Sequence, residues 1–227
     1  ENNLQDSQKL FEELLEQDPN NVDALAGLGN IALKLSKLDQ SENYLLKAIE
    51  IDPNHETALI YLAALKMRQN NYIEANEIYR KIVEIDPNNS DAFALIGRIA
   101  AIQKHPEEAE EYYQKALEID PNNVTTLEFL AILKLEQKKY DEAFAIYSKL
   151  LSIDPLNKDY AEGFHNAKEL PLVERAKKLR KNKDNEAAAA IVEQLITLSP
   201  DKIEYYLMLG LIYVNMGKKD DAIDLYN

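Results

Sequence analysis

The chain has 227 residues, no cysteine and a formal net charge of −14, from 26 Lys and Arg residues against 40 Asp and Glu residues. The lack of cysteine excludes a disulfide framework, a thiol nucleophile and a cysteine-ligated metal site. An acidic surface keeps a protein soluble and repels phosphate backbones, so we expect no nucleic-acid partner. No apolar run approaches the ~20 residues that span a bilayer, so we expect no direct membrane span.

Five prolines recur at a constant interval, namely Pro19, Pro53, Pro87, Pro121 and Pro155. Apolar residues keep the same phase at fixed distances after each proline, and a Gly or Ala follows each of the first four by ten residues. A fixed period of about 34 residues indicates a stacked-repeat architecture, in which each unit buries its apolar face against its neighbours.

The chain begins at Glu1 without a methionine, and Phe11, Leu14 and Pro19 fit a second helix with no first helix before it. We therefore expect residues 1–21 to be the second helix of a truncated repeat, in a piece of a longer protein. Four full repeats are expected to follow, at residues 22–55, 56–89, 90–123 and 124–157.

Each repeat reads as two helices. Leu25, Leu28 and Gly29 lie at i, i+3 and i+4, which places them on one face of a first helix. Ala75 and Tyr79 likewise lie on one face of a second helix. The aspartate before each proline should end the second helix, because proline disfavours helical geometry at the preceding residue. The expected stops are Asp52, Asp86 and Asp120, and the expected caps of the following first helices are Asn54, Asn89 and Asn123.

The phase breaks after Pro155. Ala189 stands where the next proline of the series is expected, and that proline comes only at Pro200. The chain therefore contains an insertion, which we place at 158–168. This segment is expected to form a short added helix, with Pro171 breaking or kinking its junction to the next. A divergent repeat at 169–202 and a truncated repeat at 203–227 follow. A tolerated insertion and a bend in the array both fit this pattern.

With these motifs, the chain is similar to the tetratricopeptide repeat family over residues 1–157 and 169–227. The resemblance implies an all-α fold, a single right-handed superhelical solenoid of antiparallel helix pairs over residues 1–227. One departure lies thirteen residues after each proline, where the family usually places a large aromatic side chain. The residues there are Ala32, Lys66, Ala100 and Lys134, and Tyr213 alone fits.

The resemblance also implies that the first helices line a concave groove. The inward stripe is more apolar than a free surface needs, which suggests that it binds a peptide or helix of another protein. The alternative is that these side chains pack against neighbouring first helices. The predicted partner-binding residues are Asn30, Lys34, Ile60, Ala64, Met67, Arg68, Ala94, Arg98, Ile102, Ile132 and Leu135.

The segment 168–184 holds seven basic residues against three acidic ones. It is either a solvated helix face or a dock for an acidic partner or lipid headgroups. The residues of this predicted basic patch are Arg175, Lys177, Lys178, Arg180 and Lys181.

Motifs for catalysis do not emerge from the sequence. His55, His105 and His165 are too scattered to bind a metal together, and no glycine-rich phosphate loop or nucleophile motif is present. We expect no enzyme activity, no cofactor and no metal in this chain.

The sequence thus predicts a protein–protein interaction scaffold. An alternative is a substrate-recruiting or regulatory arm of a larger enzyme, such as a transferase. Self-association through the truncated ends is a third expectation. The compartment stays open, with the cytoplasm preferred over a periplasmic or membrane-tethered location.

Overall fold

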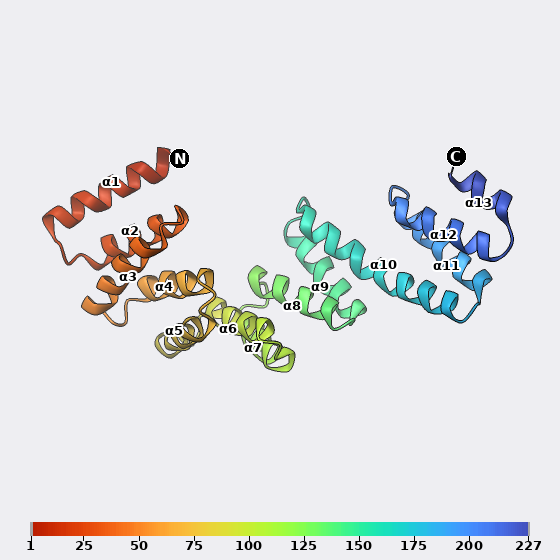
Figure 1. Ribbon diagram of the computed structural model, residues 1–227. Coiled ribbons are helices and arrows are strands. Elements are labelled where there is room, and N and C mark those ends of the chain that lie inside the picture. The colour runs from red at the N-terminus through yellow and green to blue at the C-terminus, as the bar shows by residue number, and fades with distance from the viewer. Residues whose placement is uncertain (1, 227) are drawn as a thin grey trace. The chain divides into compact units, whose positions relative to one another are not determined.

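The computed structural model describes residues 2–226, and these fold into helices without any strand (Figure 1). Glu1 and Asn227, the outermost residues of the first and last expected segments, lie outside the described residues. The helices are α1 (Asn2–Gln17), α2 (Val22–Lys34), α3 (Leu38–Ile51), α4 (Glu56–Arg68), α5 (Tyr72–Ile85), α6 (Ser90–Ile102), α7 (Pro106–Ile119), α8 (Val124–Glu136), α9 (Tyr140–Ile153), α10 (Lys158–Lys181), α11 (Asn185–Leu198), α12 (Ile203–Asn215) and α13 (Lys219–Tyr226).

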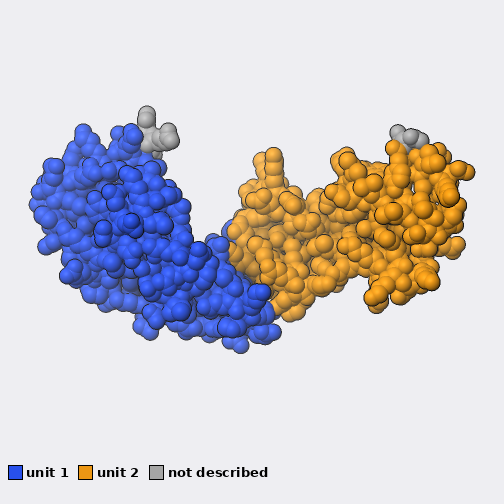
Figure 2. Space-filling model, in the orientation of Figure 1, with its two compact units in different colours: residues 1–126 blue, residues 127–227 orange. Residues whose placement is uncertain are grey.

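The chain divides into two compact units, residues 1–126 and residues 127–227, which are coloured separately in Figure 2. Unit 1 contains α1 to α7 and the start of α8, and unit 2 contains the rest of α8 and α9 to α13. The expectation of one continuous solenoid stays a prediction.

Unit 1 is built from antiparallel helix pairs, in which α2 packs on α3, α4 on α5 and α6 on α7. The second helices α3 and α5 also pack on the next first helices, α4 and α6, so these pairs stack in chain order. Glycines allow the closest approach within a pair, because a Cβ atom at Gly29 would lie 2.6 Å from the Leu45 side chain. Gly97 meets Tyr113 in the same way, at 2.7 Å. The repeat spacing therefore reflects sites where two helices leave no room for a side chain.

The predicted ends of the second helices are confirmed. Asp52, Asp86 and Asp120 are the C-caps of α3, α5 and α7. Their carboxylates accept hydrogen bonds from the backbone N–H two residues on, as between Asp86 and Asn88 at 3.0 Å. This local bond gives a partner to a backbone N–H in the turn that follows the helix, where the proline prevents the helix from continuing.

Two of the three predicted first-helix caps are confirmed, and one is wrong. Asn89 and Asn123 accept hydrogen bonds from the N–H groups of Ala92 and Thr126. Asn54 does not cap α4, because His55 holds the equivalent position and its Nδ1 accepts from Ala58 N at 3.2 Å. The capping residue lies two positions after the proline, and in this repeat it is a histidine.

A left-handed residue turns the chain between the two helices of a pair. Ser36, Asn70, Lys104 and Lys138 hold this place with φ between 57° and 62°. They are spaced by one repeat period, so the next would be Leu172. Leu172 instead lies inside α10, and the left-handed turn comes at Lys183.

The expectation of a short separate helix at 158–168 is therefore wrong, because α10 is one continuous helix of 24 residues that contains Pro171. The insertion corresponds to about three turns of an α-helix. The residues that follow it in α10 therefore lie on the same helix face as they would without the insertion. The segment around Pro171 also lacks the polar turn residues that separate the two helices of the other pairs.

The two halves of α10 use different faces. Its first half packs on α9, where a Cβ atom at Gly163 would lie 2.2 Å from the Tyr147 ring. Its second half packs on α11 through Ala176, which is fully buried in a cluster with Val192 and Leu195. The helix thus takes the place of two successive first helices, with the intervening turn and second helix absent.

None of the helices in residues 2–226 combines the length and apolar character needed to cross a membrane.

Candidate interaction surfaces

Most of the predicted groove residues of unit 1 lie on an accessible side of α2, α4 and α6. Ile60 keeps 36% of its surface exposed and Ile102 keeps 41%, which is high for side chains of this type. Lys34 and Arg98 are also exposed, and Asn30, Ala64 and Met67 are half-buried. We call this set the first-helix surface of unit 1: Asn30, Lys34, Ile60, Ala64, Met67, Arg98 and Ile102.

Two predicted groove residues of unit 1 are not part of this surface. Ala94 is fully buried, so it cannot contact a partner. Arg68 is bound within the chain, because its guanidinium donates to the carbonyl oxygen of Leu33 at 2.6 Å and to Ser36 Oγ at 3.2 Å. Arg68 thus satisfies the C-terminal end of α2, where carbonyl groups lack helical partners. For Ala94 the alternative interpretation, packing within the array, fits better, whereas Arg68 is exposed and bonded to the preceding repeat.

The first helices of unit 1 are held in register at their N-termini. His55 Nε2 lies 3.1 Å from Asp23 Oδ1, which places the start of α4 beside the start of α2. Asn89 donates to Glu56 at 2.8 Å and thereby links α6 to α4 in the same way. His55 and Asn89 therefore have two roles each, since each caps its own helix and bonds to the first turn of the preceding first helix.

The position that usually carries an aromatic residue holds a buried cation in the second full repeat. Lys66 Nζ lies 2.7 Å from a carboxylate oxygen of Glu42 and 2.7 Å from one of Glu74. Burial alone lowers the pKa of Lys66, but the hydrogen bonds to both carboxylates outweigh it and raise that pKa. The hydrogen bond from Lys66 holds the pKa of Glu42 below its usual value. Lys66 is therefore part of the packing and not of the first-helix surface.

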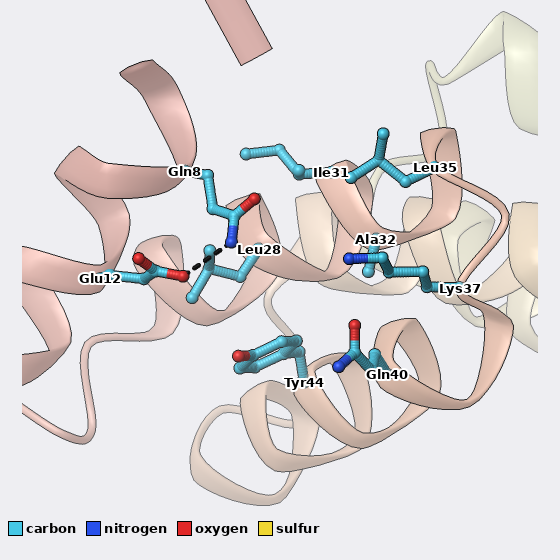
Figure 3. A pocket seen from close by; sticks show the side chains of 9 residues that line it. All are labelled: Gln8, Glu12, Leu28, Ile31, Ala32, Leu35, Lys37, Gln40 and Tyr44. Carbon is cyan, nitrogen blue, oxygen red and sulfur yellow. Dashed lines mark hydrogen bonds between the residues drawn. The ribbon is translucent and has the colours of Figure 1, made fainter. Parts of the chain in front are cut away.

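The same position in the first full repeat is Ala32, and it leaves a pocket of about 150 Å³. Figure 3 shows that Gln8 and Glu12 of α1 face this space, with Gln40 and Tyr44 of α3 across from them. Gln8 and Gln40 stand one repeat period before Glu42 and Glu74, so the pocket is the unfilled counterpart of the Lys66 site.

In unit 2 the predicted groove residues lie on α8, where Ile132 is exposed and Leu135 is half-buried. Ile132 lines a hollow of about 230 Å³ together with Glu128, Phe129, Tyr147, Asn157, Asp159 and Tyr160. The Tyr160 hydroxyl donates to the Glu128 carboxylate, and burial with this hydrogen bond raises the pKa of Tyr160 to about 12. The hollow therefore has apolar walls and contains the Glu128 carboxylate, which is hydrogen-bonded to Tyr160.

The predicted basic patch lies on the second half of α10. Arg175, Lys177, Lys178 and Lys181 are exposed, and Arg180 is half-buried. The structure thus places all five cations on one helical segment of unit 2.

A buried carboxylate that sequence reasoning missed lies beside this patch. Glu169 is 2% exposed and accepts hydrogen bonds from Ser199, Tyr205 and Lys202, the last at 2.6 Å. Burial alone raises the pKa of Glu169, but these hydrogen bonds outweigh it and lower that pKa. Glu169 joins α10 to the start of α12, as Asp23 joins α2 to α4. The repeat spacing could have pointed to Glu169. Its partner Lys202 stands two residues after Pro200, at the position that caps the first helix in the other repeats.

Among the described residues, no group of three or more His, Cys, Asp or Glu side chains is arranged to hold a metal ion.

Each unit is all-α and built from stacked antiparallel helix pairs, which is the architecture of right-handed superhelical solenoids. The chain is therefore a helical-repeat protein. Three family models match the sequence. They are the cytochrome c-type biogenesis protein H TPR domain at residues 12–119, and two tetratricopeptide repeat models at residues 100–163 and 203–227. The chain belongs to the tetratricopeptide repeat family.

Solved structures of this family share the fold at low sequence identity. YrrB, described as a TPR protein with an unusual peptide-binding site, is 18% identical with a TM-score of 0.58, over 86% of this chain and 95% of that one. A tetratricopeptide repeat protein from Parabacteroides merdae is 21% identical with a TM-score of 0.61, over 98% and 84%. The APC/C hetero-tetramer Cut9–Hcn1 is 16% identical with a TM-score of 0.66, over 98% of this chain but 42% of that chain. A search of curated proteins gave no significant match.

Tetratricopeptide repeat proteins generally serve as scaffolds that bind protein or peptide partners, and their fold is generally non-catalytic.

Proposed function

We propose that this chain is a non-catalytic scaffold that binds a peptide or helix of a partner protein on the first-helix surface of unit 1. The observation that carries the proposal is the exposure of Ile60 and Ile102 on successive first helices of one unit. Exposed apolar side chains that gather on one face are typical of interaction sites.

The polar residues of the surface suit a peptide. Asn30 offers an amide that can pair with the main chain of an extended segment, whose N–H and C=O groups have no internal partners. Lys34 of α2 and Arg98 of α6 are exposed cations on this surface. An arginine side chain can bind a carboxylate through two parallel hydrogen bonds. A partner segment with apolar side chains and at least one carboxylate therefore fits this surface best.

The experiment is selection of binders from a random peptide library on the folded chain, followed by affinity measurements on variants. Ile60→Ser/Ile102→Ser should weaken the selected peptides by about tenfold or more, the equivalent of about 1.4 kcal/mol. Leu46→Ser/Ile73→Ser is the matched control, because these residues are exposed to 48% and 70% on second helices. Peptides that bind both variants as tightly as the parent chain would show that the site lies elsewhere.

A further inference from the structure

The second half of α10 carries cations where the other first helices carry buried apolar residues. Ile96 and Ile99 hold the corresponding positions in α6, and both pack in one cluster with Tyr79 of α5, the preceding second helix. In α10 these positions are Arg175 and Lys178, and both are exposed. The side of a first helix that normally meets a second helix is therefore open and positively charged.

The geometry of unit 2 explains the exposure. Lys138, just before α9, forms an ion pair of 2.5 Å with Glu174 of α10. The N-terminal end of α9 therefore lies level with Glu174, and the rest of α10 runs past it. The opposite side of this segment is occupied by α11, which packs on Ala176. Arg175 and Lys178 are thus exposed where α10 runs beyond the N-terminal end of α9.

The charge of this segment is opposite to that of the remaining chain. Residues 168–184 carry a net charge of +4, from seven basic and three acidic residues, within a chain of −14, which leaves −18 elsewhere. A long polyanion such as duplex DNA, or an extended anionic membrane, would meet the acidic remainder and be repelled. A short acidic segment senses chiefly the nearby cations, because charges beyond about 10 Å are screened at ordinary salt.

We propose that the cationic end of α10, formed by Arg175, Lys177, Lys178 and Lys181, binds an acidic helix of a partner protein. The helix takes the position that a second helix occupies in the other pairs. Carboxylates at intervals of three residues on its surface match Arg175, Lys178 and Lys181, which are three residues apart on α10. This surface is separate from the first-helix surface of unit 1 and does not depend on the function proposed for it.

The probe for the test is a synthetic peptide with the sequence of residues 105–120, HPEEAEEYYQKALEID, an acidic second helix of this chain. Its binding to the intact chain is measured by fluorescence anisotropy at increasing salt. Arg175→Glu/Lys178→Glu should weaken binding at least tenfold, and raising the salt should weaken it for the parent chain. Lys158→Glu/Lys219→Glu, which changes the net charge by the same amount at exposed positions, should leave the affinity within about twofold of the parent. Circular dichroism confirms that both variants remain helical.

Several results would overturn the proposal. One is no binding by the parent chain, and another is equal binding by the Arg175→Glu/Lys178→Glu variant. Equal binding of a scrambled peptide with a central proline would show that charge alone is recognised and not a helix. Tighter binding to phosphatidylserine vesicles or to duplex DNA than to the peptide would assign the patch to a different partner.

Discussion

Lys66 Nζ lies 2.7 Å from Oε1 of Glu42, across the junction between two successive helix pairs. Lys66 belongs to the first helix α4 and Glu42 to the preceding second helix α3, so the contact joins one repeat to the next. The sequence departs from its family at this position, and the structure shows that a buried ion pair takes the place of an aromatic side chain. In unit 2, Lys134 bonds to Glu142 at 2.7 Å, as Lys66 does to Glu74.

We expect Lys66→Ala to destabilise the chain by roughly 2 kcal/mol, because it leaves the Glu42 carboxylate without its cation and opens a cavity. Lys66→Met, which keeps most of the volume, separates the two causes and should cost less. Urea titration followed by circular dichroism measures both. A midpoint unchanged by Lys66→Ala would mean that the pair contributes nothing net.

Ala32→Tyr should fill the pocket of about 150 Å³ between α1, α2 and α3 and stabilise the chain by about 1 kcal/mol. The phenol ring adds apolar contacts, and Gln8 and Gln40 line the same space and offer partners for the hydroxyl group. Differential scanning calorimetry gives the shift in Tm. A lower Tm would show that the pocket cannot accept a ring without displacing α1.

His55→Ala should cost about 1 kcal/mol, because Ala58 N loses its capping acceptor. His55→Asn is the matched control, since asparagine caps the equivalent positions at Asn21 and Asn89 through the same backbone bond. It should retain most of the stability in chemical denaturation. Equal losses in the two variants would mean that the bond from His55 to Asp23, and not the cap, is the important contact.

Pro171→Ala should stabilise α10 by about 1–3 kcal/mol, because it restores a backbone donor to the carbonyl of Ala167 and relieves the clash of the proline ring. Amide hydrogen exchange in residues 160–181 should slow relative to the parent chain. Exchange that becomes faster would show that the proline is needed for the path of this helix between α9 and α11.

Glu169 should make unit 2 sensitive to acid. Its pKa is lower in the folded chain than the usual value of about 4.3, so its stabilising effect is fully present above that value. The effect is lost as the pH falls from about 4.3 through the lowered pKa. Glu169→Gln should be less stable than the parent at pH 6, and the difference should shrink by pH 3. Urea midpoints at both values test this, and a constant difference would exclude the linkage.

Much of the fold follows from local sequence. The Asp-Pro steps end the second helices at Asp52 and Asp86 because proline cannot donate a helical hydrogen bond and restricts the residue before it. The glycine at position 29 marks the closest approach within a pair, since any side chain there would overlap Leu45. These are short-range steric rules, and the constant repeat period applies them along the chain.

Contacts between repeats were decided only by the tertiary structure. Whether Arg68 bonds to the carbonyl of Leu33, and whether Lys66 is exposed or paired with Glu42, depends on residues of the preceding repeat. The path of α10 belongs to the same group. Periodicity located the insertion, but its length of about three turns lets a helix continue in phase, and the face on which each half packs is set by α9 and α11.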